Sequence, residues 1–86
     1  MKLEIEIINE EKTVFSGQGD FIAVPGEQGE IGVLPGHAKF FSTLNPGTVR
    51  IRNQESEQTV DIHQGFIEID SDRVRIFTSS LPMDEE

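Results

Sequence analysis

The chain has 86 residues and no cysteine, and its 16 acidic and 7 basic side chains give a formal net charge of −9 at pH 7. This length supports a single domain, and the lack of cysteine excludes disulfides, thiol catalysis and zinc–thiolate sites. The negative charge disfavours binding to nucleic acid and to anionic lipid, because both need clustered lysine and arginine. If the protein sits at a membrane, we therefore expect another protein to hold it there.

The N-terminal residues, MKLEIEIINEEK, predict a strand and no export signal. They lack the unbroken apolar run of a signal peptide, and no later segment approaches the roughly 20 apolar residues that a membrane-spanning helix needs. Leu3, Ile5 and Ile7 alternate with charged residues, as in a half-buried strand. We expect a soluble protein that is not exported.

Short runs rich in Val, Ile, Thr and Phe continue along the rest of the chain, each closed by turn residues. They cover residues 13–17, 20–24, 30–34, 39–44, 48–52, 59–63, 66–70 and 73–77. Turn signals about every 8–12 positions are typical of an all-β sandwich or barrel. No window has convincing helical spacing, so the sequence predicts an all-β fold without significant helix.

Two hairpins can be given a register. In residues 49–62 a loop centred on Glu55 and Ser56 is predicted, with the cross-strand pairs Val49–Ile62, Ile51–Val60 and Arg50–Asp61. In residues 66–77 a turn at Ser71 and Asp72 is predicted, with the pairs Ile67–Ile76, Glu68–Arg75, Ile69–Val74 and Asp70–Arg73. A slip by one residue would invert every side chain, so agreement of the apolar and charged faces favours this register. It also favours cross-strand partners over an anion site as the role of the arginines.

The sequence predicts neither catalysis nor a metal or cofactor site. His37 and His63 are far apart and have no metal-ligand spacing. The glycine-rich stretches at 17–19 and 26–32 precede predicted strands, whereas phosphate-binding loops open a helix, and Glu27 and Glu30 would repel phosphate. We interpret these stretches as turns and the two glutamates as solvated.

Phe40 and Phe41 are adjacent, so on a strand they point to opposite faces. One can fill the core. The other is either covered by a loop or exposed on a face that binds a partner.

Four blocks resemble one family in order and spacing: FSG at 15–17, VPGEQGEIGVLPGHA at 24–38, NPGTVRI at 45–51 and GFIEI at 65–69. The chain is similar over nearly its whole length to the N-terminal β-sandwich domain of the epsilon subunit of F-type ATP synthases. The resemblance implies a flattened antiparallel β-sandwich of about ten short strands over residues 1–80, followed by a short acidic tail at 81–86.

The resemblance also implies a function. Members of the family are non-catalytic rotor subunits of the central stalk, at the cytoplasmic face of the bacterial inner membrane. They join the gamma subunit to the polar loops of the membrane c-ring, so that ion-driven rotation reaches the catalytic subunits. The implied partners are therefore gamma and the c-ring, with no cofactor, small-molecule ligand, nucleic acid or inserted lipid.

By motif position, Glu30 corresponds to the ring-facing glutamate of the family, with Glu27 and Gln28 on the same turn. His37 corresponds to a histidine near gamma. The remaining positions implied on the gamma-facing side are Asn9, Phe41 and Ser42.

The sequence departs from the family pattern at several positions. Lys39 stands where the family often has proline, and Phe40 and Phe41 stand where it has an aliphatic pair. Asn45 replaces a common lysine, and Gln64 replaces the first of two common glycines. After Phe77 the chain reads TSSLPMDEE, where many members continue into a helical hairpin with inhibitory and, in some members, ATP-binding roles. We therefore expect that this polypeptide alone neither arrests ATP hydrolysis with a C-terminal helix nor binds nucleotide, whether it is naturally short or truncated. The alternative to a rotor subunit is a small stand-alone β-sandwich that binds another protein.

Overall fold

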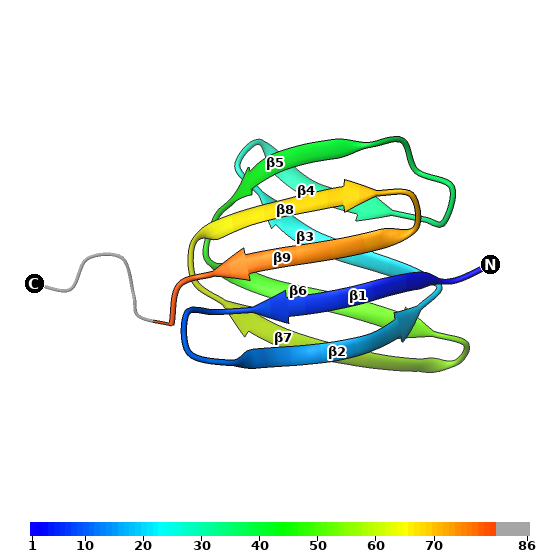
Figure 1. The fold of residues 1–86 in the computed structure, drawn as a ribbon, viewed down its shortest axis with the longest axis horizontal. Helices are drawn as coiled ribbons and strands as arrows, with labels where there is room; N and C mark the ends of the chain where they lie inside the picture. The colour runs from blue at the N-terminus through cyan, green and yellow to red at the C-terminus, as the bar shows by residue number, and fades with distance from the viewer. Residues whose placement is uncertain (81–86) are drawn as a thin grey trace, which may run out of the picture.

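The computed structural model describes residues 1–80, which form nine β-strands and no helix (Figure 1). The strands are β1 (Leu3–Ile8), β2 (Thr13–Gly19), β3 (Phe21–Gly26), β4 (Gly29–Val33), β5 (Phe40–Leu44), β6 (Gly47–Asn53), β7 (Ser56–Ile62), β8 (Gly65–Asp70) and β9 (Arg73–Thr78). The predicted all-β class is confirmed, with nine strands here instead of about ten. The predicted tail at 81–86 lies outside the described residues. Within residues 1–80, no helix has the length and apolar character needed to cross a membrane.

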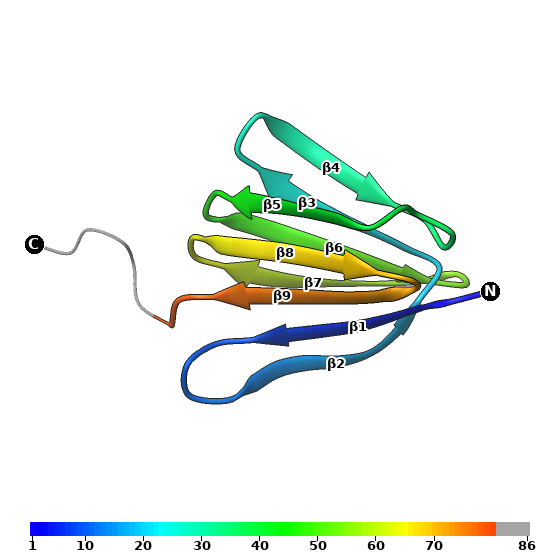
Figure 2. The same cartoon turned by 45° about the horizontal axis from the view of Figure 1, so that its top comes forward.

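The strands form two layers that are joined along one edge (Figure 2). The front layer has the order β2-β1-β9-β8-β5, and the back layer has the order β4-β3-β6-β7. At the junction, Leu44 of β5 lies opposite Gly26 of β3, and the Asn45 N–H donates to the Pro25 carbonyl at 2.8 Å. The strand path is therefore continuous, and the sandwich is nearly closed into a barrel.

One pair of neighbouring strands departs from the antiparallel expectation. β1 and β9 run parallel, with Ile5 beside Val74 and Ile7 beside Ile76. The predicted antiparallel sandwich is confirmed for the other strand pairs, and β1–β9 is the parallel exception among residues 1–80. Parallel neighbours need a long connection, and here most of the chain lies between them, so no local sequence pattern marks the pairing.

The core between the layers is aliphatic. Its buried members are Leu3, Ile5, Ile7, Ile22, Val24, Val33, Leu44, Val49, Ile51, Ile62, Ile67, Ile69, Val74 and Ile76. Each fully buried side chain of this kind stabilises the fold by about 1.5–3 kcal/mol. No polar or charged residue of the described chain is buried, so its polar chemistry lies at the surface.

The predicted register of the second hairpin is confirmed, but that of the first is wrong by two residues. In the first hairpin Val49 pairs with Val60, and Arg50 pairs with Thr59. The turn lies at Gln54 and Glu55, between the paired residues Asn53 and Ser56, which is one residue earlier than predicted, and Gln54 adopts a positive φ of 61° that suits such a short connection. A shift of two keeps every side chain on its face, so the apolar pattern could not detect the error.

The correction changes the partners of two charged residues. Asp61 lies opposite Thr48, whose hydroxyl donates to its carboxylate at 2.9 Å. Arg50 instead pairs with Glu30, at 2.8 Å. In the second hairpin, Arg73 and Arg75 lie opposite the predicted acids, yet the ion pairs within residues 1–80 are only Lys2–Asp20 and Arg50–Glu30.

Replacement of a core residue should be far more costly than that of an exposed one. Ile67→Ala removes a side chain with 0% exposure and should lower the free energy of unfolding by about 2–5 kcal/mol, because it leaves a cavity. Leu34→Ala, at a side chain with 60% exposure, is the control and should change it by less than about 0.5 kcal/mol. Urea titration measures both, and equal losses would contradict the packing described above.

Candidate interaction surfaces

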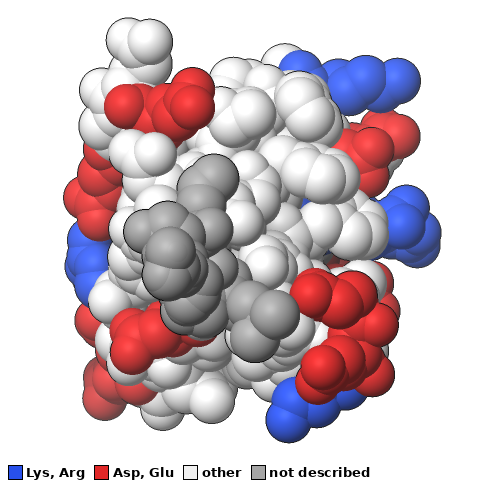
Figure 3. All heavy atoms as spheres, turned by 90° about the vertical axis from the view of Figure 1, so that its left-hand side faces the viewer, with Lys and Arg blue, Asp and Glu red and all other residues white. Residues whose placement is uncertain are grey.

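The loops of the sandwich gather at two ends. The end at the left of Figure 1 carries the connections at residues 9–12, 27–28, 45–46 and 63–64, and the other end carries those at 34–39, 54–55 and 71–72. Figure 3 views the first of these ends and shows acidic side chains around its rim. The candidate residues are distributed over both ends and both layers of the sandwich.

The three residues predicted to face the c-ring lie together. Glu27 and Gln28 form the turn between β3 and β4, Glu30 follows on β4, and all three are exposed. Gly26 and Gly29 close the turn as a cross-strand pair. A Cβ on Gly26 would come within 2.5 Å of Ile31 Cδ1, and Gly29 has a φ of +134°, so both positions require glycine.

Glu30 is tied to the back layer by an ion pair. Arg50 Nη2 donates to Glu30 Oε2 at 2.8 Å, and this hydrogen bond raises the pKa of Arg50 above its usual value. The pair is at the surface, with 39% and 58% of the two side chains exposed. The glutamates of this hairpin are thus at the surface, as predicted, and one of them already has a cationic neighbour.

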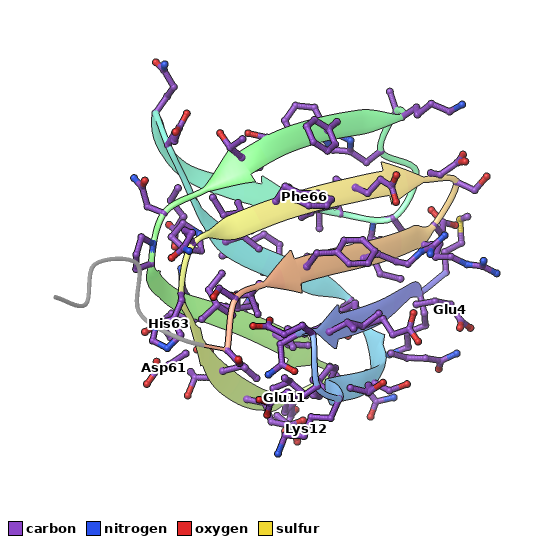
Figure 4. All side chains as sticks on the ribbon, turned by 60° about the vertical axis from the view of Figure 1, so that its left-hand side comes forward. Glu4, Glu11, Lys12, Asp61, His63 and Phe66 are labelled. Carbon is purple, nitrogen blue, oxygen red and sulfur yellow. The ribbon has the colours of Figure 1, made fainter. Side chains whose placement is uncertain are left out.

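Asn9, predicted to face gamma, has a local structural role. Its side-chain oxygen accepts hydrogen bonds from the N–H groups of Glu11 at 2.7 Å and Lys12 at 2.9 Å, which closes the β1–β2 loop. Figure 4 shows Glu11 and Lys12 at the same end of the molecule as Asp61 and His63. Asn9 therefore lies at the end that also carries the β3–β4 turn.

His37, also predicted to face gamma, lies at the opposite end. It sits on the β4–β5 connection, half-buried, with its ring edge against Phe40 at a centroid distance of 5.6 Å. Asp72 of the β8–β9 turn holds this connection by accepting the Gly36 N–H at 2.8 Å. The connection that carries His37 is thus fixed to the front layer.

Phe41 and Ser42 point to opposite faces of β5. Phe41 is 59% exposed on the outer face, whereas Ser42, in register with buried Ile67, is half-buried and donates to the Thr43 carbonyl at 3.2 Å. The prediction that one phenylalanine of the Phe40–Phe41 pair packs on the core is confirmed by Phe40.

Phe41 is part of a ladder of rings on the outer face of the front layer. Its ring centroid lies 5.3 Å from that of Phe66, and Phe66 lies 5.0 Å from Phe77 in a stacked arrangement. Phe66 is visible on the outer side of β8 in Figure 4. We call Phe41, Phe66 and Phe77 the aromatic patch. Sequence reasoning missed Phe66 and Phe77, although their outward positions in the predicted second hairpin could have found them.

The structure therefore brings together Glu27, Gln28 and Glu30 but distributes the residues predicted to face gamma. Asn9 lies at one end, His37 lies at the other, and Phe41 and Ser42 lie on the strand between them. Within residues 1–80 no group of His, Cys, Asp or Glu could hold a metal ion. A surface depression that adjoins the patch at Phe41 is also lined by Glu4, Lys39, Glu68, Asp70, Arg73 and Arg75, among others.

Two carboxylates tie chain segments together at opposite ends. The Glu10 carboxylate accepts hydrogen bonds from the Ser80 N–H at 3.1 Å and from the Ser80 hydroxyl at 2.8 Å. A hydrogen bond from the backbone N–H of Glu10, together with those from Ser80, lowers the pKa of Glu10. Asp20 pairs with Lys2 at 2.8 Å and accepts the Gln54 N–H at 2.5 Å, and these bonds lower the pKa of Asp20. Both contacts therefore favour the ionised carboxylate.

The family model described as ATP synthase, Delta/Epsilon chain, beta-sandwich domain matches residues 2–82. The chain belongs to this family. The ATP synthase epsilon chain of Bordetella avium is 35% identical over 79 residues, which cover 91% of this chain and 56% of that relative. The epsilon chain of Herminiimonas arsenicoxydans is 34% identical over 80 residues, with 91% and 57% covered. The chain thus spans little more than half the length of these delta/epsilon relatives.

Two solved structures share the delta/epsilon sandwich fold. A chain of the Euglena gracilis mitochondrial ATP synthase, in a structure of OSCP, F1 and c-ring, superposes with a TM-score of 0.83 at 21% identity, covering 90% of this chain and 50% of that one. A chain of the Tetrahymena thermophila mitochondrial ATP synthase central stalk and c-ring gives 0.74 at 14% identity, covering 93% and 65%. At these identities the likeness establishes the fold.

Acid should weaken the contact made by Asp20. Because its pKa is lowered by folding, its contribution to stability is fully present above the ordinary value of 3.8 and is lost as the pH falls through the folded-state pKa. In urea titrations from neutral pH downwards, the free energy of unfolding should fall more steeply for the wild type than for Asp20→Asn or Lys2→Gln.

Lys12→Gln is the control for this prediction, since Lys12 is an exposed lysine outside the ion pairs of residues 1–80. It should retain the wild-type acid dependence. If the free energy of unfolding of Asp20→Asn fell with pH as steeply as that of the wild type, the Asp20 contact would not contribute to the acid dependence of stability.

Proposed function

We propose that this chain is the β-sandwich of an epsilon-type central-stalk subunit that joins the gamma subunit to the c-ring of an ATP synthase. The single observation that carries the proposal is the family match over residues 2–82, with relatives named ATP synthase epsilon chain. The role is mechanical and non-catalytic. A closely packed aliphatic core suits it, because such interiors deform little under load.

The aromatic patch is the proposed centre of the gamma interface. Phe41 exposes 59% of its surface, and its two stacked neighbours extend the apolar area across three strands of the front layer. Aromatic side chains in such clusters supply much of the binding energy of protein interfaces. Of the other residues implied by the family pattern, His37 and Asn9 would lie toward the two ends of this interface. Ser42 would contribute least, since its side chain faces away from Phe41.

The acidic β3–β4 turn is the proposed contact with the c-ring. Glu27 and Gln28 lie exposed on the turn at the end of the sandwich, Glu30 is exposed next to them on β4, and a basic loop of the ring would complement the charge of the two glutamates. With a net charge of −9, the chain would be held at the cytoplasmic face of a bacterial inner membrane by these protein contacts and not by lipid. Rotation of the ring would then reach gamma through the sandwich.

Binding to gamma distinguishes this proposal from a stand-alone β-sandwich module. We expect the chain to bind the gamma subunit from the same source with one-to-one stoichiometry in calorimetry. Phe41→Ala should weaken binding at least tenfold, about 1.4 kcal/mol, because it removes the most exposed ring of the patch.

Leu34→Ala is the matched control, since Leu34 and Phe41 are 60% and 59% exposed and only Phe41 belongs to the patch. It should leave the affinity unchanged. Tight binding by both variants would move the interface away from the patch. Absence of binding by folded wild-type protein would favour the stand-alone module.

A further inference from the structure

The ion pair between Glu30 and Arg50 spans a strand that contributes neither residue. Glu30 on β4 lies opposite Pro25 of β3, and Arg50 on β6 lies opposite Ala23 of β3. The two side chains therefore meet diagonally over the outer face of β3, at 2.8 Å. Small side chains beneath this contact leave room for it, and Ala23 is only 1% exposed.

Only one oxygen of the Glu30 carboxylate is used by this contact. Arg50 Nη2 donates to Oε2, and the Glu30 carboxylate makes no other hydrogen bond or ion pair within residues 1–80. A carboxylate can accept bonds at both oxygens. The second oxygen thus remains open to a cationic group from outside the chain, while the first holds the side chain in one orientation.

Glu30 is the residue that contacts the Arg50 guanidinium. A second acid, Glu57 on the neighbouring strand β7, lies opposite Arg52 and adds a weaker attraction that also raises the pKa of Arg50. Arg50 is half-buried, in contrast to Arg52 on the same outer face, which is exposed and lies 5.5 Å from the centroid of the Phe21 ring. The two arginines carry the same charge, but only Arg50 contacts Glu30.

We propose that Arg50 is a positioning residue of the ring-facing surface, which orients the Glu30 carboxylate for a basic group of the c-ring. This inference rests on the proposed function, because it assumes that Glu30 meets the ring. Ordering a free glutamate side chain on binding costs free energy, and a side chain already fixed in the unbound protein avoids much of that cost. Arg50 would therefore increase affinity although it has the same charge sign as the proposed partner group.

The direction of the change in ring affinity distinguishes a positioning role for Arg50 from a purely electrostatic one. Loss of either arginine makes the chain more acidic by one charge, which by long-range attraction should strengthen binding to a basic surface. If Arg50 instead competes with the ring for Glu30, its removal should strengthen binding further. A positioning role predicts that Arg50→Ala weakens binding while Arg52→Ala does not, and that the loss disappears when Glu30 is already replaced.

The experiment measures binding of the 86-residue chain to the detergent-solubilised c-ring from the same source, for wild type, Arg50→Ala, Arg52→Ala, Glu30→Gln and the Arg50→Ala, Glu30→Gln double variant. We expect Arg50→Ala to weaken binding by about three- to tenfold, as the loss of one ordered side chain would. Arg52→Ala should bind at least as well as wild type. The double variant should bind like Glu30→Gln alone, because Arg50 acts through Glu30.

The outcomes separate the inference from the function on which it rests. If Glu30→Gln weakens binding and Arg50→Ala does not, the positioning role is wrong and the ring contact stands. If Glu30→Gln has no effect, or wild type does not bind the ring, both are wrong. Unchanged urea midpoints in all variants would exclude unfolding as the cause of a loss, and additive losses in the double variant would overturn the inference.

Discussion

The alternation of side chains along each strand is the constraint on which the rest of this structure depends. Inward positions of both layers are filled by Ile, Val and Leu, and no polar residue within residues 1–80 is buried. Most outward positions are thereby free of core packing and can carry charged or aromatic side chains, although Ala23 is covered by the ion pair above it. Phe40 and Phe41 show the consequence, since neighbours in sequence serve the core and the surface respectively. Because side chains alternate along a strand, the residues that face the core determine which residues face outward.

The ends of the sandwich rely on a different kind of contact. Side-chain oxygens there accept backbone N–H groups that strand pairing leaves free, as Asn9 does within its loop and Asp72 does for Gly36. Asp20 and Glu10 join segments that are distant in sequence. Such exposed contacts contribute little individually to stability. Their importance is geometric, because loops held in one conformation can present a preformed surface to a partner.

The sequence predicted those features that local periodicity can encode. The predicted register of the second hairpin is correct in every pair, because its short turn and two fully alternating strands favour a single register. The first hairpin was wrong because a shift of two leaves the pattern of Val49 and Val60 intact. The parallel pairing of β1 with β9, the contact of Arg50 with Glu30 across β3, and the contact of Phe41 on β5 with Phe66 on β8 depend on the order of strands in space. None of these can be read from spacing within one segment.

In the proposed assembly the two partners would contact different layers, and the topology offers a short path between them. Phe41 lies on β5 of the front layer, whereas Glu30 and Arg50 lie on β4 and β6 of the back layer. β5 reaches β3 directly through Leu44 and Gly26, and β3 pairs with both β4 and β6. A force applied at the ring-facing turn would therefore pass through strand hydrogen bonds to β5, which carries Phe41 of the aromatic patch. No flexible linker lies on that path, so the sandwich itself would transmit the load between gamma and the ring.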